Sequence, residues 1–175
     1  MDTVLVALLV MMMMLHGVMT VATGWTSAQE LTSAAWADMA ARTSERASTG
    51  LRIIDVEASG STVLVTVQNS GEVRLAGFDA WDVILHCHTA LGQYRIERLP
   101  LAGGALPGEG WSVQGLYLQA AERRAEVYEP GVLNPGEEMI IRASLSVPLA
   151  EEATHLLVVG TPNGVTSSRQ FTATP

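Results

Sequence analysis

The chain begins with a run of apolar residues long enough to cross a membrane. The run, residues 4–22, is broken only by His16, Gly17 and Thr20, so apolar side chains would cover every side of a helix. About 20 such residues span a hydrocarbon layer of ~30 Å. Lys and Arg usually orient a spanning helix, yet the first basic residue here is Arg42. The pattern therefore allows a membrane helix that lacks a positive flank.

The helical pattern continues beyond this run. Residues 24–50 are rich in Ala, no Pro occurs before Pro100, and Gly50 is a typical helix stop. We predict one helix from about residue 2 to about residue 48, roughly 70 Å long at ~1.5 Å per residue. Its second half places small and apolar groups on one stripe, at spacings of three and four: Ala28, Leu31, Ala35 and Met39.

After Gly50 the chain alternates between short β-type segments and turn residues. In the second segment Val63, Val65 and Val67 point to one side of a strand and the residues between them to the other. Turns rich in Gly, Pro and Asn separate the segments. The predicted strands are residues 51–58, 61–69, 81–88, 93–99, 111–118, 138–147, 154–160 and 165–173.

Eight strands without a second helix indicate an antiparallel sandwich. We therefore expect the α+β class, with one long N-terminal α-helix followed by an all-β, antiparallel, Ig-like β-sandwich. The expected domains are the hydrophobic polymerisation helix, residues 1–50, and the outer sandwich, residues 51–175. A sandwich of this size buries a core without disulfides or metals. Residues 101–110 are interpreted as a surface loop.

Composition narrows the classes of function. The 175 residues include 18 acidic groups and ten basic ones, all Arg, for a net charge of −8. This charge repels nucleic acid, so we expect no nucleic-acid partner. Cys87 is the only cysteine, which excludes an intrachain disulfide. Its place in a strand favours a small core residue over a nucleophile.

His86 and His88 are the residues most suggestive of a metal site. Two positions apart on a strand, they project to the same face. The spacing places no third ligand beside them, so exposed imidazoles explain the pair better than a metal centre. A third class of function is an extracytoplasmic module that binds a carbohydrate or a metal through this pair with Asp55 and Glu57.

No arrangement of residues indicates catalysis. Paired carboxylates such as Asp79 and Asp82 can serve a glycosidase, but a solvated surface explains them better in an acidic sandwich. The stretch GGALPGEG lacks the strand and the helix that flank a phosphate-binding loop. We predict that the protein is not an enzyme and that it uses no cofactor.

Three motifs in the sandwich segment, together with the apolar helix, resemble the archaellum protein family. The motifs are FDAWDV (78–83), EPGVLNPGEEM (129–139) and TPNGVTSS (161–168). The resemblance extends over nearly the whole chain in the same order. The family comprises the filament subunits, called archaellins, and their sandwich-bearing accessory or stator relatives. Because the motifs are turn sequences, they indicate a lineage rather than an active site.

The resemblance implies a membrane-inserted precursor with a short basic class III leader, which a prepilin-type peptidase removes just before the apolar helix. Met1 would then be the first residue of the mature chain, which accounts for the missing positive flank. Position 5 is Leu5, where pilins usually have Glu, and archaellins share this departure. Family membership also implies a membrane motor that rotates an extracellular filament.

Our leading hypothesis is a structural subunit of an archaellum-type, type IV pilus-like motility filament at the cell surface. The helix would polymerise with copies of itself into a helical filament, and its small residues would allow close approach. The expected interface consists of Val4, Leu5, Leu8, Leu9, Met12, Leu15, His16, Gly17, Met19, Gly24, Ala28, Leu31, Ala35 and Met39.

The alternative is a membrane-anchored archaellum accessory or stator protein. Its helix would stay in the bilayer, and its sandwich would bind the cell envelope or the filament. Two features favour the filament hypothesis, in which the helix packs against protein and not only lipid. His16 would be costly to bury alone in lipid. A helix of ~47 residues also exceeds a bilayer span by about two dozen residues.

Overall fold

A single uninterrupted helix, α1 (Asp2–Ser48), forms the first part of the chain. It is seen in a computed structural model that describes residues 2–102, 109–126 and 129–174. The helix agrees with the prediction. Threonines within it bond back to the preceding turn, as Thr20 Oγ1 does to the carbonyl of His16 at 2.8 Å. The chain divides into two compact units, Met1–Ser44 and Glu45–Pro175.

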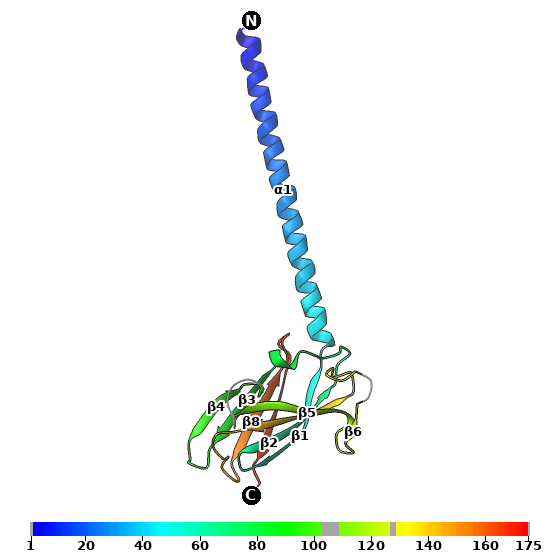
Figure 1. Ribbon diagram of the computed structural model, residues 1–175. Coiled ribbons are helices and arrows are strands. Elements are labelled where there is room, and N and C mark those ends of the chain that lie inside the picture. The colour runs from blue at the N-terminus through cyan, green and yellow to red at the C-terminus, as the bar shows by residue number, and fades with distance from the viewer. Residues whose placement is uncertain (1, 103–108, 127–128, 175) are drawn as a thin grey trace. The chain divides into compact units, whose positions relative to one another are not determined.

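The second unit is a sandwich of two antiparallel sheets (Figure 1). The five-stranded sheet has the order β1-β2-β7-β5-β6, and the four-stranded sheet has the order β4-β3-β8-β9. The strands are β1 (Leu51–Ser59), β2 (Thr62–Asn69), β3 (Asp82–His88), β4 (Tyr94–Leu99), β5 (Gly110–Gln119), β6 (Arg124–Ala125), β7 (Glu138–Ser144), β8 (Thr154–Gly160) and β9 (Thr166–Thr172).

The expected α+β architecture is confirmed, with two additions. The short strand β6 and a 3-10 turn, η1 (Phe78–Ala80), were not predicted. β6 has only two residues, and η1, in the FDAWDV motif, has only three. Both are too short for a helical or strand periodicity of hydrophobic residues to be recognised. Most of the expected surface loop, residues 103–108, lies outside the described residues.

The core of the sandwich is self-contained. Val63, Val65 and Val67 are fully buried, as their alternation predicted. They belong to one cluster with residues of the four-stranded sheet such as Val83 and Leu157. Each buried side chain of this size contributes about 1.5–3 kcal/mol. Every buried member of the cluster comes from residues 51–173, so the second unit does not need the first to complete its core.

Gly50 does not end α1 in the predicted manner. The expected stop is a glycine with a left-handed backbone, but Gly50 has no positive φ. The segment carrying Gly71 instead passes directly against it, and a Cβ added to Gly50 would lie 2.5 Å from the backbone nitrogen of Gly71. Gly50 also accepts a bond of 3.1 Å from the N–H of Ser70. Glycine is therefore required here by the close approach of two backbones.

Candidate interaction surfaces

The side chains of α1 lie on the surface of the described chain. All fourteen residues of the expected polymerisation interface are exposed. No charged residue occurs between Thr3 and Gln29, and by length and composition α1 is able to cross a membrane. Monomeric soluble proteins rarely expose so large a continuous apolar surface. The first unit therefore has a surface suited to cover by lipid or by protein.

Two tryptophans that are not part of the predicted interface, Trp25 and Trp36, line shallow hollows on α1. One hollow of about 540 Å³ lies between them and includes the small residues Ala28 and Thr32. Another, of about 560 Å³, lies on the N-terminal side of Trp25 and includes Gly17. The signal in the sequence is the spacing of eleven residues between the tryptophans, about three helical turns, which places both rings on one side.

Gly17 and Gly24 are open positions. A Cβ added at either one would meet no atom within 4 Å. Packing within the chain therefore does not require a glycine at either position. Close approach of a second helix would use both, and this part of the expected interface stays a prediction.

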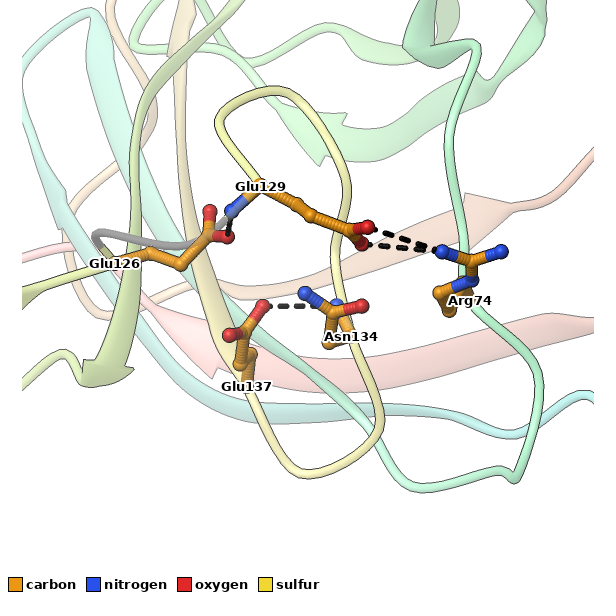
Figure 2. A network of polar contacts seen from close by, with 5 residues as sticks. All are labelled: Arg74, Glu126, Glu129, Asn134 and Glu137. Atoms are coloured by element: carbon orange, nitrogen blue, oxygen red, sulfur yellow. Dashed lines mark hydrogen bonds and ion pairs between the residues drawn. The ribbon is translucent and has the colours of Figure 1, made fainter.

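Three carboxylates hold the loop that carries the EPGVLNPGEEM motif (Figure 2). Glu129 and Glu137 belong to the motif, and Glu126 precedes it. Glu129 accepts bonds from Arg74 Nη1 at 3.1 and 3.2 Å. Glu126 Oε1 accepts the backbone N–H of Glu129 at 2.6 Å, and Glu137 Oε2 accepts that of Asn134 at 2.8 Å. These acids satisfy the loop's own backbone and one arginine. The motif fixes a turn, as its sequence suggested.

Leu133 in the middle of this motif is anchored to the core. It is fully buried and exchanges two backbone bonds with Leu75, of 2.7 and 3.0 Å. The buried side chain of Asn69 donates to the carbonyls of Leu133 and Val73 at 2.9 and 2.8 Å, and accepts from the N–H of Gly71 at 3.0 Å. One amide thus joins two loop segments, residues 71–73 and the segment of Leu133, which supports a structural role.

The TPNGVTSS motif also forms a turn. Thr161 N–H donates to the carbonyl of Val165 at 2.9 Å, and Thr161 Oγ1 donates to Asn163 Oδ1 at 2.6 Å. Asn163 in turn donates to Thr49 Oγ1 at 2.8 Å and accepts from Arg46 Nε at 2.6 Å. The motif therefore binds the segment that leads into β1.

The strand positions of His86, Cys87 and His88 agree with the prediction. The imidazoles lie on the outer face of β3, where His86 Nδ1 is 3.2 Å from the hydroxyl of Tyr94. Cys87 points into the core and is 2% exposed. Burial raises the pKa of the Cys87 thiol, and the nearby charge of Glu97 adds to the rise. Cys87 is thus a poorly ionised core residue.

The structure does not bring the two carboxylates and the two histidines of the third class together. Asp55 and Glu57 lie on β1 of the five-stranded sheet, whereas His86 and His88 lie on β3 of the four-stranded sheet. Among the described residues no group of three or more His, Cys, Asp or Glu is arranged to hold a metal ion. The hypothesis of a joint site made of these four residues is therefore wrong.

His155, which the sequence left without a role, is a buried structural residue of β8. Its Nδ1 accepts the backbone N–H of His88 at 3.3 Å, and its Nε2 lies 3.0 Å from the carbonyl of Ala150. The ring packs on Phe171, with centroids 5.3 Å apart. Burial lowers the pKa of His155, the bond to Ala150 opposes this, and His88 lowers it further. The site favours a neutral imidazole that carries its proton on Nε2.

Comparisons with known proteins bear on the sandwich. No family model and no curated protein sequence matches the chain. The archaellum periplasmic stator protein FlaG from Sulfolobus acidocaldarius matches with a TM-score of 0.52 and 24% identity, over 70% of this chain and 99% of that chain. The sandwich has the fold of FlaG. The expected resemblance to archaellum proteins is thus confirmed at the level of the fold.

Two further solved structures are similar. The stator protein complex FlaF and FlaG from Sulfolobus acidocaldarius gives a TM-score of 0.51 at 24% identity, over 69% of this chain and 87% of that chain. Flagellin FlaB1 from Methanocaldococcus jannaschii gives 0.48 at 11% identity, over 71% and 90%.

Proposed function

We propose that this protein is a membrane-anchored archaellum component of the stator type. Its helix α1 would hold it in the membrane, and its sandwich would act in the cell envelope, on the envelope itself or on the filament. The observation that carries the proposal is the presence, in one chain, of an uncovered apolar helix and a sandwich with the FlaG fold.

The order of residues along α1 supports an anchor. The uncharged stretch from Thr3 to Trp25 covers about 33 Å at ~1.5 Å per residue, close to the ~30 Å of a hydrocarbon core. Trp25, at its end, is the residue type that prefers the membrane interface. The polar half of α1 that follows has the composition of a helix outside lipid, with Glu30 and the exposed ion pair of Asp38 and Arg42.

Fractionation of cells that make the tagged full chain tests the proposal. We expect the protein in the membrane fraction, resistant to carbonate extraction and released by detergent, and absent from sheared filaments. We also expect cells that lack it to assemble filaments that do not rotate normally. Recovery of the protein as a main component of sheared filaments, or full motility without it, would contradict the stator role.

The second candidate is a filament subunit, for which α1 itself gives a specific reason. The hollows beside Trp25 and Trp36 are lined partly by small residues, as expected where a neighbouring helix packs closely. In this role α1 would form the helical polymer core after processing by a prepilin-type peptidase and assembly by the archaellum motor. Electron micrographs and mass spectra of sheared filaments distinguish the two candidates, because only the second places the chain in the polymer.

A further inference from the structure

Three side chains that neither proposed role uses meet on the outer face of the four-stranded sheet. His86 and His88 lie two positions apart on β3, and Tyr94 lies on the adjacent strand β4. The sequence pattern showed no third group beside the two histidines, because Tyr94 joins them only through the pairing of the strands. The fold therefore adds a partner that changes what the histidine pair is able to do.

The register of the two strands decides which residues Tyr94 reaches. It lies directly opposite His88 and diagonally to His86. Residues directly opposite one another have Cβ atoms about 4.5–5.5 Å apart, and diagonal neighbours stay within reach of an aromatic side chain. The hydroxyl of Tyr94 lies 3.2 Å from Nδ1 of His86, and its ring packs on that of His88 with centroids 5.1 Å apart. One side chain thus orients two imidazoles.

The contact at Nδ1 prepares the other ring nitrogen of His86 for a ligand. When Nδ1 carries the proton and donates it to the hydroxyl of Tyr94, Nε2 is left with its lone pair. Histidines that bind metals almost always have their second ring nitrogen engaged in this way, which fixes the tautomer and the direction of the ring. Tyr94 therefore acts on His86 as a positioning residue.

The backbone beneath the pair is held on both sides. β3 lies between β4 and β8 in the sheet, and the N–H of His88 donates to Nδ1 of the buried His155 at 3.3 Å. At ~3.3 Å per residue, the Cα atoms of His86 and His88 are about 6.6 Å apart. Imidazoles at this spacing are able to converge on one metal ion at the usual nitrogen–metal distance of ~2.0–2.1 Å. The strand itself does not have to move.

The surroundings of the pair suit a cation. The residues opposite His86 on this face are uncharged, Ile96 on β4 and Leu156 on β8. Arg98, further along β4, is held by Asp82 through a bond of 2.7 Å. The net charge of −8 on the chain also attracts a positive ion from solution. The electrostatic field therefore favours metal binding at these imidazoles.

The donor set selects the class of metal. Mg²⁺ and Ca²⁺ take oxygen ligands, so two imidazoles do not suit them. Zinc sites in proteins use three or four protein ligands, which is more than this surface offers. Cu²⁺ binds nitrogen donors more strongly than the other divalent first-row metals do, and its tetragonal geometry accepts two imidazoles. The arrangement therefore fits Cu²⁺ best.

We propose that His86 and His88 bind one Cu²⁺ ion on the outer face of β3, with Tyr94 as a positioning residue. The ion takes Nε2 of His86 and one ring nitrogen of His88, and water fills its remaining positions. Tyr94 limits the rotation of both rings, which reduces the entropy lost on binding. The site lies within one sandwich, so it needs no second copy and does not depend on which envelope role is correct.

Titration of the full chain in detergent with copper chloride, against glycine as a competing ligand, measures the affinity. We expect one tightly bound ion per chain. His86→Ala and His88→Ala should each weaken binding at least about tenfold, because loss of one imidazole turns two linked contacts into one. An excess of Mg²⁺ or Ca²⁺ should not displace the copper. His16 is present in every protein compared and contributes the same background.

A matched control keeps the number of exposed imidazoles and breaks only their spacing. The double variant His88→Ala with Ser168→His carries the second imidazole at an exposed position of β9, beyond the intervening strand β8. Its affinity for copper should equal that of His88→Ala alone. Recovery of tight binding in the double variant would contradict chelation by two neighbouring imidazoles of β3.

Electron paramagnetic resonance of the bound Cu²⁺ counts its imidazole ligands. We expect two in the unaltered chain and one in His88→Ala. Tyr94→Phe keeps the ring against His88 and removes only the hydroxyl. Two imidazoles should remain in this variant while the affinity falls about tenfold, as for other partners of metal-bound histidines. Thermal unfolding without copper should change little, because the residue is 57% exposed.

Three results would overturn the inference. They are an affinity of the unaltered chain no higher than that of His88→Ala, a single imidazole per ion, and one ion shared between two chains in sedimentation. The first would mean that copper makes only the adventitious contact that any exposed histidine offers. An affinity unchanged by Tyr94→Phe would refute the positioning role of Tyr94.

Discussion

The backbone N–H of His88 donates to Nδ1 of His155 and joins the end of β3 to a buried imidazole of β8. The acceptor is available only while His155 is neutral on Nδ1. Protonation would place two donors face to face in a buried site. The hydrogen bond between β3 and β8 at this point therefore requires an uncharged His155.

Stability should fall when the sandwich is acidified below about pH 6.5. Burial lowers the folded-state pKa of His155 below the ordinary value of about 6.5, so the unfolded chain takes up the proton first. The stabilisation is full above that value and is lost as the pH falls towards the folded pKa, with a slope of at most ~1.4 kcal/mol per pH unit. Urea unfolding at about pH 7.5 and pH 5.5 measures it. His155→Gln should remove this dependence, and an unchanged slope would refute the assignment.

Gly71→Ala should destabilise the sandwich by about 2–3 kcal/mol, because its Cβ has no space beside the backbone of Gly50. Ser70→Ala, at the exposed neighbouring position, should change the free energy of unfolding by no more than about 0.5 kcal/mol. Thermal and urea unfolding of the two variants give the comparison. Equal stability of both would show that the two segments separate at little cost.

Asn69→Ala should cost about 2–3 kcal/mol, since it leaves one buried and two partly buried backbone groups without their side-chain partner. Arg74→Ala removes the largely exposed ion pair with Glu129 from the same region and should cost less than about 1 kcal/mol. Urea unfolding measures both. A larger loss from Arg74→Ala would mean that the surface pair, not the buried amide, holds the EPGVLNPGEEM loop.

Ala28→Trp in the full chain should reduce any association through α1, because it fills the hollow between Trp25 and Trp36. Ala41→Trp puts the same ring on the opposite, charged side of the helix and should have no effect. Sedimentation in detergent and pelleting of filaments measure association, and near-ultraviolet circular dichroism checks that the sandwich stays folded. The same loss from both variants would argue against a contact at this hollow.

Alternation and turn chemistry predicted most of the fold. The valines of β2 revealed their buried face because each strand of the sandwich has one side in the core. The true role of Gly50 could not be predicted, because the segment of Gly71 that requires it is distant in the sequence. The same holds for His155, whose partners come from β3 and from residue 150. Long-range contacts decide both positions, and local patterns do not record them.

The candidate surfaces were predicted unevenly for a related reason. The apolar residues of α1 are evident from the composition of residues 4–22, so the sequence alone predicts a contact role for the helix. That Trp25 and Trp36 share a face of the helix follows only from their spacing of about three helical turns. A groove on the outer face of the five-stranded sheet could not be foreseen, since its lining includes Ile54 and Gln114, at register shifts that the local sequence does not reveal.

Because the buried core of the sandwich comes from residues 51–173, changes in residues 2–44 of α1 should not alter its folding. A genetic screen for loss of function should therefore recover α1 variants at normal cellular abundance, whereas core variants such as those at Leu157 should be depleted by proteolysis. Protein level alone would then sort new alleles into those that break an assembly and those that break a fold.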